Sequence, residues 1–125
     1  MNIKVNLAFN SKALVELIEI DPDGENGLIG SLITAYKENS VLLYDQVVLG
    51  TGIKDPKKAE AALHSLRSSS AVLGLERLAA LCGELEDKIE IDIPTTEELK
   101  LLQQELNLGL KELGAYRLPT PKPKI

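Results

Sequence analysis

The feature that most restricts the fold is the regular spacing of apolar residues between positions 75 and 89. Leu75, Leu78, Cys82, Leu85 and Ile89 are separated alternately by three and four residues, which is the spacing of one face of an α-helix. The opposite side of this stretch is charged. Only 3% of all residues are aromatic, so a core has to be built from Leu, Ile, Val and Ala. Both observations favour an all-helical protein.

Two helices are predicted in the first half of the chain. A short helix runs over residues 12–20, with Ser11 as a candidate N-cap, and the turn-forming sequence at 21–27 ends it. From Leu28 the apolar residues again recur at spacings of three and four, up to the sequence "LGTG". The β-branched cluster at 41–49 would also suit a strand, but no alternating partner strand lies nearby. We therefore expect one long helix.

The next helix has strong boundary signals. Asp55 can cap its N-terminus, and Pro56 suits the first helical position because proline lacks an N–H group that the helix would need there. We expect this helix to run to about Leu73. Gly74 then provides a break or a kink before the regular stripe at 75–89.

A capping box opens the last helix, because Thr95 is followed three positions later by Glu98. This helix should reach about Leu113. The segment after it is rich in proline and lysine and does not suit a helix. The expected organisation is a helical domain over residues 1–117 and a flexible tail over 118–125, which could also be the start of a linker.

These elements predict one all-α domain. Short connections between consecutive helices favour antiparallel neighbours. We expect an antiparallel up-down-up-down four-helix bundle with an additional short N-terminal helix. A closed bundle buries its apolar stripes without a second copy, so a monomer is expected.

Charge and cysteine content exclude several classes of function. The 125 residues include 14 basic and 19 acidic side chains, a formal net charge of -5, which argues against nucleic acid or an anionic membrane as the main partner. No apolar run approaches the roughly 20 residues of a membrane-spanning helix. The single cysteine cannot form an internal disulfide, and the N-terminus lacks the pattern of a secretory signal. We expect a cytoplasmic protein.

The single histidine, His64, lies off the expected core stripe of its helix. That stripe consists of Ala59, Ala62, Leu63, Leu66, Ser70 and Leu73. The neighbours of the histidine on the same helix face are Glu60, Arg67 and Ser68, with Lys57 and Ala71 one turn farther out. The imidazole is therefore expected to be exposed on a polar face.

An exposed imidazole is mostly neutral near pH 7, so one ring nitrogen of His64 has a lone pair that can attack phosphorus. Arg67 would add a positive charge able to bind phosphoryl oxygens. The small Ser68 and Ala71 leave room for a flat partner surface, and Glu60 should turn toward solvent. The alternative is a surface histidine without a role.

The residues around the histidine resemble the histidine phosphotransfer (HPt) family, whose pattern is roughly H-x-L-K-G-S-S-x-x-L-G followed by x-x-x-L-x-x-x-C-x-x-L-E. The residues at the defined positions of this pattern are His64, Leu66, Arg67, Ser68, Ser69, Ser70, Leu73, Gly74, Leu78, Cys82, Leu85 and Glu86, with Arg67 in place of the usual Lys and Ser68 in place of the usual Gly. Tyr36 stands where an aromatic residue is usual. The likeness covers roughly residues 10–115.

This resemblance implies that His64 accepts a phosphoryl group from the aspartyl phosphate of a receiver domain and passes it to another receiver. It implies a carrier protein with no kinase site, no cofactor and no metal of its own, because the magnesium belongs to the receiver. The partner would be a receiver of a response regulator or a hybrid sensor kinase. Arg67 and Ser68 would lie beside the phosphoryl group, and Lys57, Glu60 and Ala71 would contact the partner. Leu and Ile residues of the first two helices should add apolar docking surface.

Ser68 raises an alternative, because the family usually has glycine there. Its hydroxyl could bond back to the His64 carbonyl or donate to a phosphoryl oxygen, and it adds bulk in either case. The chain could then be an interaction module that docks a receiver or kinase with little or no phosphotransfer. A structural bundle or a hydrolytic enzyme is a third reading, in which a nucleophilic serine would have no base beyond His64.

Overall fold

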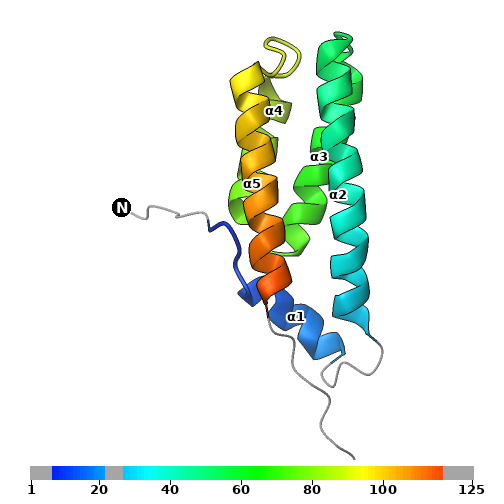
Figure 1. The fold of residues 1–125 in the computed structure, drawn as a ribbon, viewed down its shortest axis with the longest axis vertical. Helices are drawn as coiled ribbons and strands as arrows, with labels where there is room; N and C mark the ends of the chain where they lie inside the picture. The colour runs from blue at the N-terminus through cyan, green and yellow to red at the C-terminus, as the bar shows by residue number, and fades with distance from the viewer. Residues whose placement is uncertain (1–6, 22–26, 117–125) are drawn as a thin grey trace, which may run out of the picture.

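The computed structural model describes residues 7–21 and 27–116 and contains five helices in this part of the chain. They are α1 (Lys12–Ile20), α2 (Leu28–Gly52), α3 (Pro56–Val72), α4 (Glu76–Lys88) and α5 (Thr96–Ala115). Helices α2 to α5 pack in sequence, α5 also packs on α2, and α1 lies across one end of the bundle (Figure 1). The predicted all-α bundle with a short N-terminal helix is confirmed, and residues 41–49 are helical.

The predicted N-caps of α3 and α5 are confirmed. Asp55 accepts a hydrogen bond from the backbone N–H of Lys58 at 3.2 Å, with proline at the first helical position. At α5, the Thr95 hydroxyl accepts the N–H of Glu98 and the Glu98 carboxylate accepts the N–H of Thr95, both at 3.1 Å. These bonds satisfy backbone donors that have no partner within the helix.

The cap of α1 differs from the prediction. Ser11 occupies the N-cap position, but its side chain makes no capping hydrogen bond. Asn10, one residue earlier, accepts the backbone N–H of Lys12 through its side-chain oxygen at 3.1 Å. The reason is the backbone of Ser11, which already has helical dihedral angles, whereas a capping side chain normally extends from a non-helical residue.

Gly74 makes a sharp break between α3 and α4. Its φ of 81° is left-handed, a conformation that glycine adopts without strain. Its carbonyl accepts the backbone N–H of Asn10 at 2.7 Å, and a Cβ at this position would overlap the Asn10 carbonyl oxygen. This contact ties the segment before α1 to the turn between α3 and α4.

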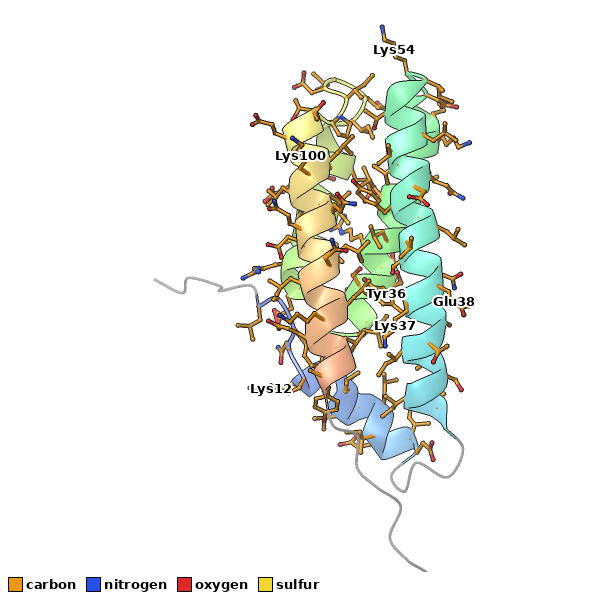
Figure 2. All side chains as sticks on the ribbon, viewed as in Figure 1. Lys12, Tyr36, Lys37, Glu38, Lys54 and Lys100 are labelled. Carbon is orange, nitrogen blue, oxygen red and sulfur yellow. The ribbon has the colours of Figure 1, made fainter. Side chains whose placement is uncertain are left out.

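Tyr36 marks the inner side of α2. Figure 2 shows it pointing into the bundle, whereas Glu38, two positions later, points outward. The Tyr36 hydroxyl lies 2.7 Å from the hydroxyl of Ser70 on α3, in a buried hydrogen bond. Burial raises the pKa of Tyr36 to about 12, so the phenol stays protonated near neutral pH. The bond gives both buried hydroxyls a partner.

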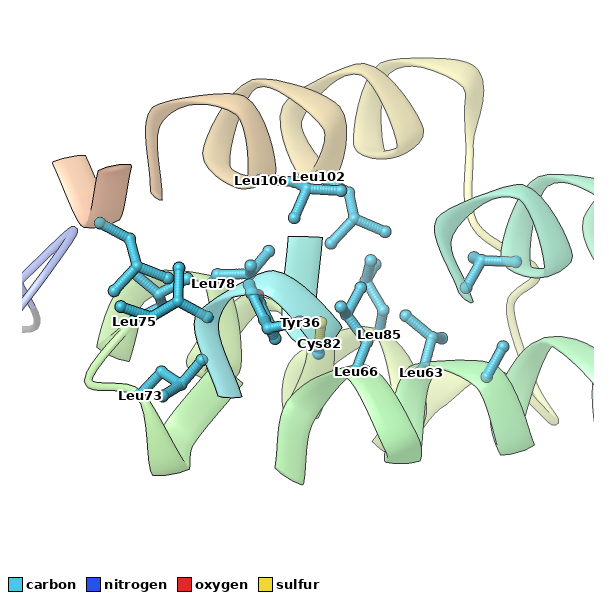
Figure 3. Close-up of a cluster of buried hydrophobic side chains, with 14 of the residues drawn as sticks. Tyr36, Leu63, Leu66, Leu73, Leu75, Leu78, Cys82, Leu85, Leu102 and Leu106 are labelled. Atoms are coloured by element: carbon cyan, nitrogen blue, oxygen red, sulfur yellow. The ribbon is translucent and has the colours of Figure 1, made fainter. Parts of the chain in front are cut away.

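The core is built mainly from aliphatic side chains and has contributions from all five helices. Figure 3 shows part of it, with labelled side chains from α2 to α5. Every residue of the predicted stripe at 75–89 is buried, and so is every residue of the predicted α3 stripe. Leucine predominates, and the thiol of Cys82 fills a small space between the larger side chains. The spacing in the sequence therefore identified the inner faces of α3 and α4 correctly.

Some of the sequence-based predictions concern residues that the structure does not describe. The expected flexible tail, 118–125, lies outside the described residues, as do residues 22–26 of the turn after α1. Within residues 7–21 and 27–116, none of the helices combines the length and apolar character needed to cross a membrane.

Replacing Thr95 by Ala should destabilise the protein by about 1 kcal/mol, because it removes the side-chain acceptor of the α5 capping box. Urea denaturation followed by circular dichroism measures the free energy of unfolding. Thr96→Ala is the matched control, since that side chain lies one position inside the helix and does not form the cap. Equal losses in the two variants would contradict the capping role.

The stability that Glu98 contributes should depend on pH. The hydrogen bond from the Lys88 ammonium, and then the bond from the Thr95 N–H, lower the pKa of Glu98 below its ordinary value. A carboxyl with a lowered folded-state pKa stabilises the fold above its unfolded pKa, and loses this effect as pH falls through the folded value. Wild type should exceed Glu98→Gln in urea midpoint at pH 7, and the gap should close as pH falls below about 4.3. A constant gap would contradict this linkage.

Candidate functional site

His64 is an exposed side chain on the side of α3 that faces α4. Its side chain is 66% exposed, which confirms that it lies off the core stripe. It lines an open groove of about 620 Å³. The other residues of this groove, called the histidine groove below, are Lys57, Glu60, Ala61, Ser65, Glu86 and Glu90. The imidazole is therefore accessible to a molecule that approaches α3 and α4 together.

Glu86 on α4 holds the imidazole of His64 in one orientation. Its Oε1 lies 2.8 Å from Nδ1 of the ring. A carboxylate can only accept, so in the neutral ring the proton lies on Nδ1 and the lone pair on Nε2. An acceptor bound at Nδ1 therefore determines that Nε2 is the unprotonated nitrogen of the neutral ring. The ring nitrogen with an available lone pair is consequently Nε2.

This contact was not expected from the sequence, although Glu86 was part of the resemblance. Helical spacing identifies neighbours of His64 only on its own helix, whereas Glu86 belongs to the next one. A signal was present, because Glu86 follows the core residue Cys82 by four positions and must lie at the edge of the buried stripe of α4. Only the packing of α4 on α3 shows which edge faces His64.

Arg67 shares the same carboxylate. Its Nη1 lies 3.5 Å from Oε2 of Glu86, while Oε1 contacts His64. The Glu86 side chain is only 15% exposed and the Arg67 side chain is 49% exposed. Arg67 therefore lies against α4 beside the histidine and supplies positive charge to a carboxylate that is largely withdrawn from water.

Ser68 is exposed, and its hydroxyl donates to the carbonyl oxygen of His64 at 3.1 Å. This is one of the two arrangements expected from the sequence. Ser69 does the same one position later, donating to the Ser65 carbonyl at 2.9 Å. Both hydroxyls bond along their own helix, as serine often does within a helix. The Ser68 proton is thus directed at the backbone.

The remaining predicted contact residues differ in their surroundings. Lys57 and Ala71 are exposed, and Lys57 lines the histidine groove. Glu60 does not turn fully into solvent as expected. It is half-buried and lines the same groove, because it lies one turn before His64 on the side of α3 that approaches α4. The histidine is therefore bordered by acidic groups on both helices.

Cys82 is not a nucleophile near neutral pH. Burial, and secondarily the negative charge of Glu86, raise the pKa of its thiol to about 12, so the reactive thiolate is scarcely populated. Among the residues that the structure describes, no group of three or more His, Cys, Asp or Glu side chains could hold a metal ion.

An apolar groove of about 570 Å³ lies on the other side of α3, between α3 and α2. Its apolar rim includes Leu42 of α2, 58% exposed, and Val72 of α3, 57% exposed. Ser65 lines both this groove and the histidine groove. Apolar surface near His64 was expected from the first two helices, but α1 does not contribute to this groove because it lies across the end of the bundle.

Comparison with known proteins identifies the family of the chain. The sequence pattern of the Hpt domain matches residues 31–115, which include both grooves and the contact between His64 and Glu86. The chain belongs to the Hpt domain family. Hpt domains are phosphoryl carriers that act in phosphorelays with receiver domains. The family suggested by the pattern around the histidine is thereby confirmed, over most of the stretch where the likeness was seen.

One curated relative of this Hpt domain is the multistep phosphorelay regulator 1 of Schizosaccharomyces pombe. The two are 31% identical over 72 residues, which are 58% of this chain and 24% of that protein. The chain thus matches about a quarter of the length of this relative. No solved structure matches the chain.

Replacing Glu86 by Gln should lower the fraction of neutral His64 that carries its proton on Nδ1. An amide can either donate or accept, so both neutral forms of the ring would become populated. Nitrogen-15 spectra of the imidazole, recorded where the neutral ring predominates, measure the fraction with the proton on Nδ1. Glu90→Gln is the matched control, because it removes a carboxylate from the same groove but not the bond to the ring. A fraction unchanged by Glu86→Gln would contradict the assignment.

Proposed function

We propose that this Hpt domain is a phosphoryl carrier that uses Nε2 of His64 as its acceptor atom. The contact between Nδ1 and the Glu86 carboxylate supports this most directly, since it leaves the lone pair on the exposed nitrogen. The donor would be the aspartyl phosphate of one receiver domain, and the recipient would be the aspartate of another. The chain would act as a carrier and bring no kinase site.

The transfer balances without any further reactant. The lone pair of Nε2 attacks phosphorus, an N–P bond forms, and the P–O bond to the aspartyl group breaks. The aspartate leaves as a carboxylate with that electron pair. The imidazole of His64 keeps its proton on Nδ1 and gains positive charge, which the Glu86 carboxylate at 2.8 Å offsets. Transfer onward is the reverse reaction with a second aspartate.

The apolar groove between α2 and α3 supports docking of a receiver. A stable protein contact needs more area than a single side chain provides. Leu42 and Val72 present exposed apolar surface on one side of α3, and the histidine groove opens on the other. Ser65 lines both grooves, and its small side chain does not obstruct a partner that covers them together. We assign Lys57, Glu60 and Ala71 to the rim of the same contact.

Arg67 and Ser68 are assigned supporting roles beside the phosphoryl group. Arg67 keeps positive charge near the ring through Glu86. Because Ser68 bonds to its own helix, it places a compact hydroxymethyl group beside His64. This bulk is the basis of the second candidate function, a module that docks a receiver without efficient transfer.

Incubation of the pure protein with phosphoramidate tests the carrier function. One phosphoryl group should appear in the intact mass and disappear in acid, as expected for phosphohistidine. His64→Gln should remain folded, because the side chain is exposed, and should take up no label. Ser65→Ala is a matched control on the same face and should label normally. Labelling that persists in His64→Gln would refute the proposal.

Ser68→Gly separates the carrier from the docking module. If the chain is a carrier, the labelled wild-type protein should pass its phosphoryl group to a purified receiver domain, and removing the Ser68 side chain should change the rate only modestly. A docking module would bind the receiver but transfer poorly, and Ser68→Gly would raise the transfer rate by more than about tenfold. That larger gain would favour the second function.

A further inference from the structure

Gly83 on α4 lies directly beneath the guanidinium group of Arg67. It is buried on the side of α4 that faces α3. A Cβ built at this position would lie 3.1 Å from Cζ of Arg67, 3.2 Å from Nε and 3.5 Å from Nη1. Three atoms of the planar group at nearly equal distances show that its face is turned toward the glycine. A side chain at position 83 would crowd the guanidinium by a few tenths of an ångström, so the glycine allows the guanidinium to lie this close to α4.

This placement reaches the histidine through one carboxylate. Arg67 contacts Oε2 of Glu86, and Oε1 of the same group contacts Nδ1 of His64. Because Glu86 is only 15% exposed, water cannot fully replace a lost cation. If the guanidinium were displaced, the unpaired Glu86 carboxylate would be more stable when rotated toward solvent. The imidazole of His64 would then lose the partner that orients it.

We propose that Gly83 is a positioning residue for the reaction at His64, because its missing side chain makes the space in which Arg67 holds Glu86 against the imidazole. This inference rests on the proposed function and extends it to a residue that touches neither the ring nor a phosphoryl group. Arg67 then acts through Glu86 and does not need to contact the phosphoryl oxygens.

The proposal predicts that residues 67 and 83 depend on each other. A guanidinium is a broad planar group, whereas a lysine ammonium is compact and sits on a thin flexible chain. A methyl group at position 83 should therefore displace the side chain of Arg67 but should be tolerated when that residue is replaced by lysine. Residues that share a contact show this kind of non-additive behaviour, and distant residues do not.

Four proteins test this dependence, namely wild type, G83A, R67K and the double variant R67K/G83A. For each, nitrogen-15 spectra give the fraction of His64 with the proton on Nδ1, and phosphoramidate gives the rate of labelling. G83A alone should lower the fraction and slow labelling by at least about threefold. Adding G83A to R67K should change neither quantity.

The unfolding midpoint of the same four proteins gives a second measurement. An alanine normally stabilises a helix relative to glycine, so G83A should raise the midpoint in the R67K background. In the wild-type background it should lower the midpoint, because the added carbon crowds the guanidinium of Arg67. Gly30→Ala in α2 is the control, since no atom lies within 4 Å of the added carbon. It should leave the imidazole unchanged.

Two results would overturn the proposal. One is an unchanged tautomer and labelling rate in folded G83A. The other is an equal loss from G83A in the wild-type and R67K backgrounds, which would mean that the glycine does not act through Arg67. If wild type takes up no label, the carrier function fails. The spectra and unfolding midpoints then still decide whether Gly83 positions Arg67.

Discussion

The packing of α4 against α3 determines the chemistry available at His64. The stripe that includes Leu78, Cys82 and Leu85 is buried, so α4 cannot rotate about its axis without exposing apolar surface. That orientation directs Glu86 toward the imidazole and Gly83 toward Arg67. The apolar core thus sets the orientation of a polar group at its edge. The lone pair on Nε2 follows from the packing of the leucines.

The two sides of α3 in this Hpt domain differ in chemistry. On the α4 side, Glu86 orders the ring and stays largely out of water, where its charge has more effect on a nearby cation. On the α2 side, Leu42 and Val72 offer apolar surface with no such chemistry. His64 is close to both sides and is itself exposed. In the proposed carrier, a receiver domain would gain contact area on one side and reach Nε2 of His64 on the other.

Sequence reasoning succeeded where local rules suffice and failed where helix packing decides. The core stripes, the caps at Asp55 and Thr95 and the exposure of His64 all follow from helical periodicity or from residues close in sequence. The contact between His64 and Glu86 joins residues 22 positions apart, and no helical spacing specifies which edge of α4 meets α3. The capping bond expected of Ser11 and the solvent exposure expected of Glu60 were wrong for similar reasons, since each depends on backbone or side-chain surroundings beyond the residue type.

The central claim is that Nε2 of His64 is the acceptor atom because Glu86 occupies Nδ1. The most direct test is to label the protein uniformly with nitrogen-15, phosphorylate it with phosphoramidate and measure which ring nitrogen is coupled to phosphorus. Coupling to Nε2 is expected, with the proton retained on Nδ1. Coupling to Nδ1, or a phosphoryl group on any other residue, would contradict it.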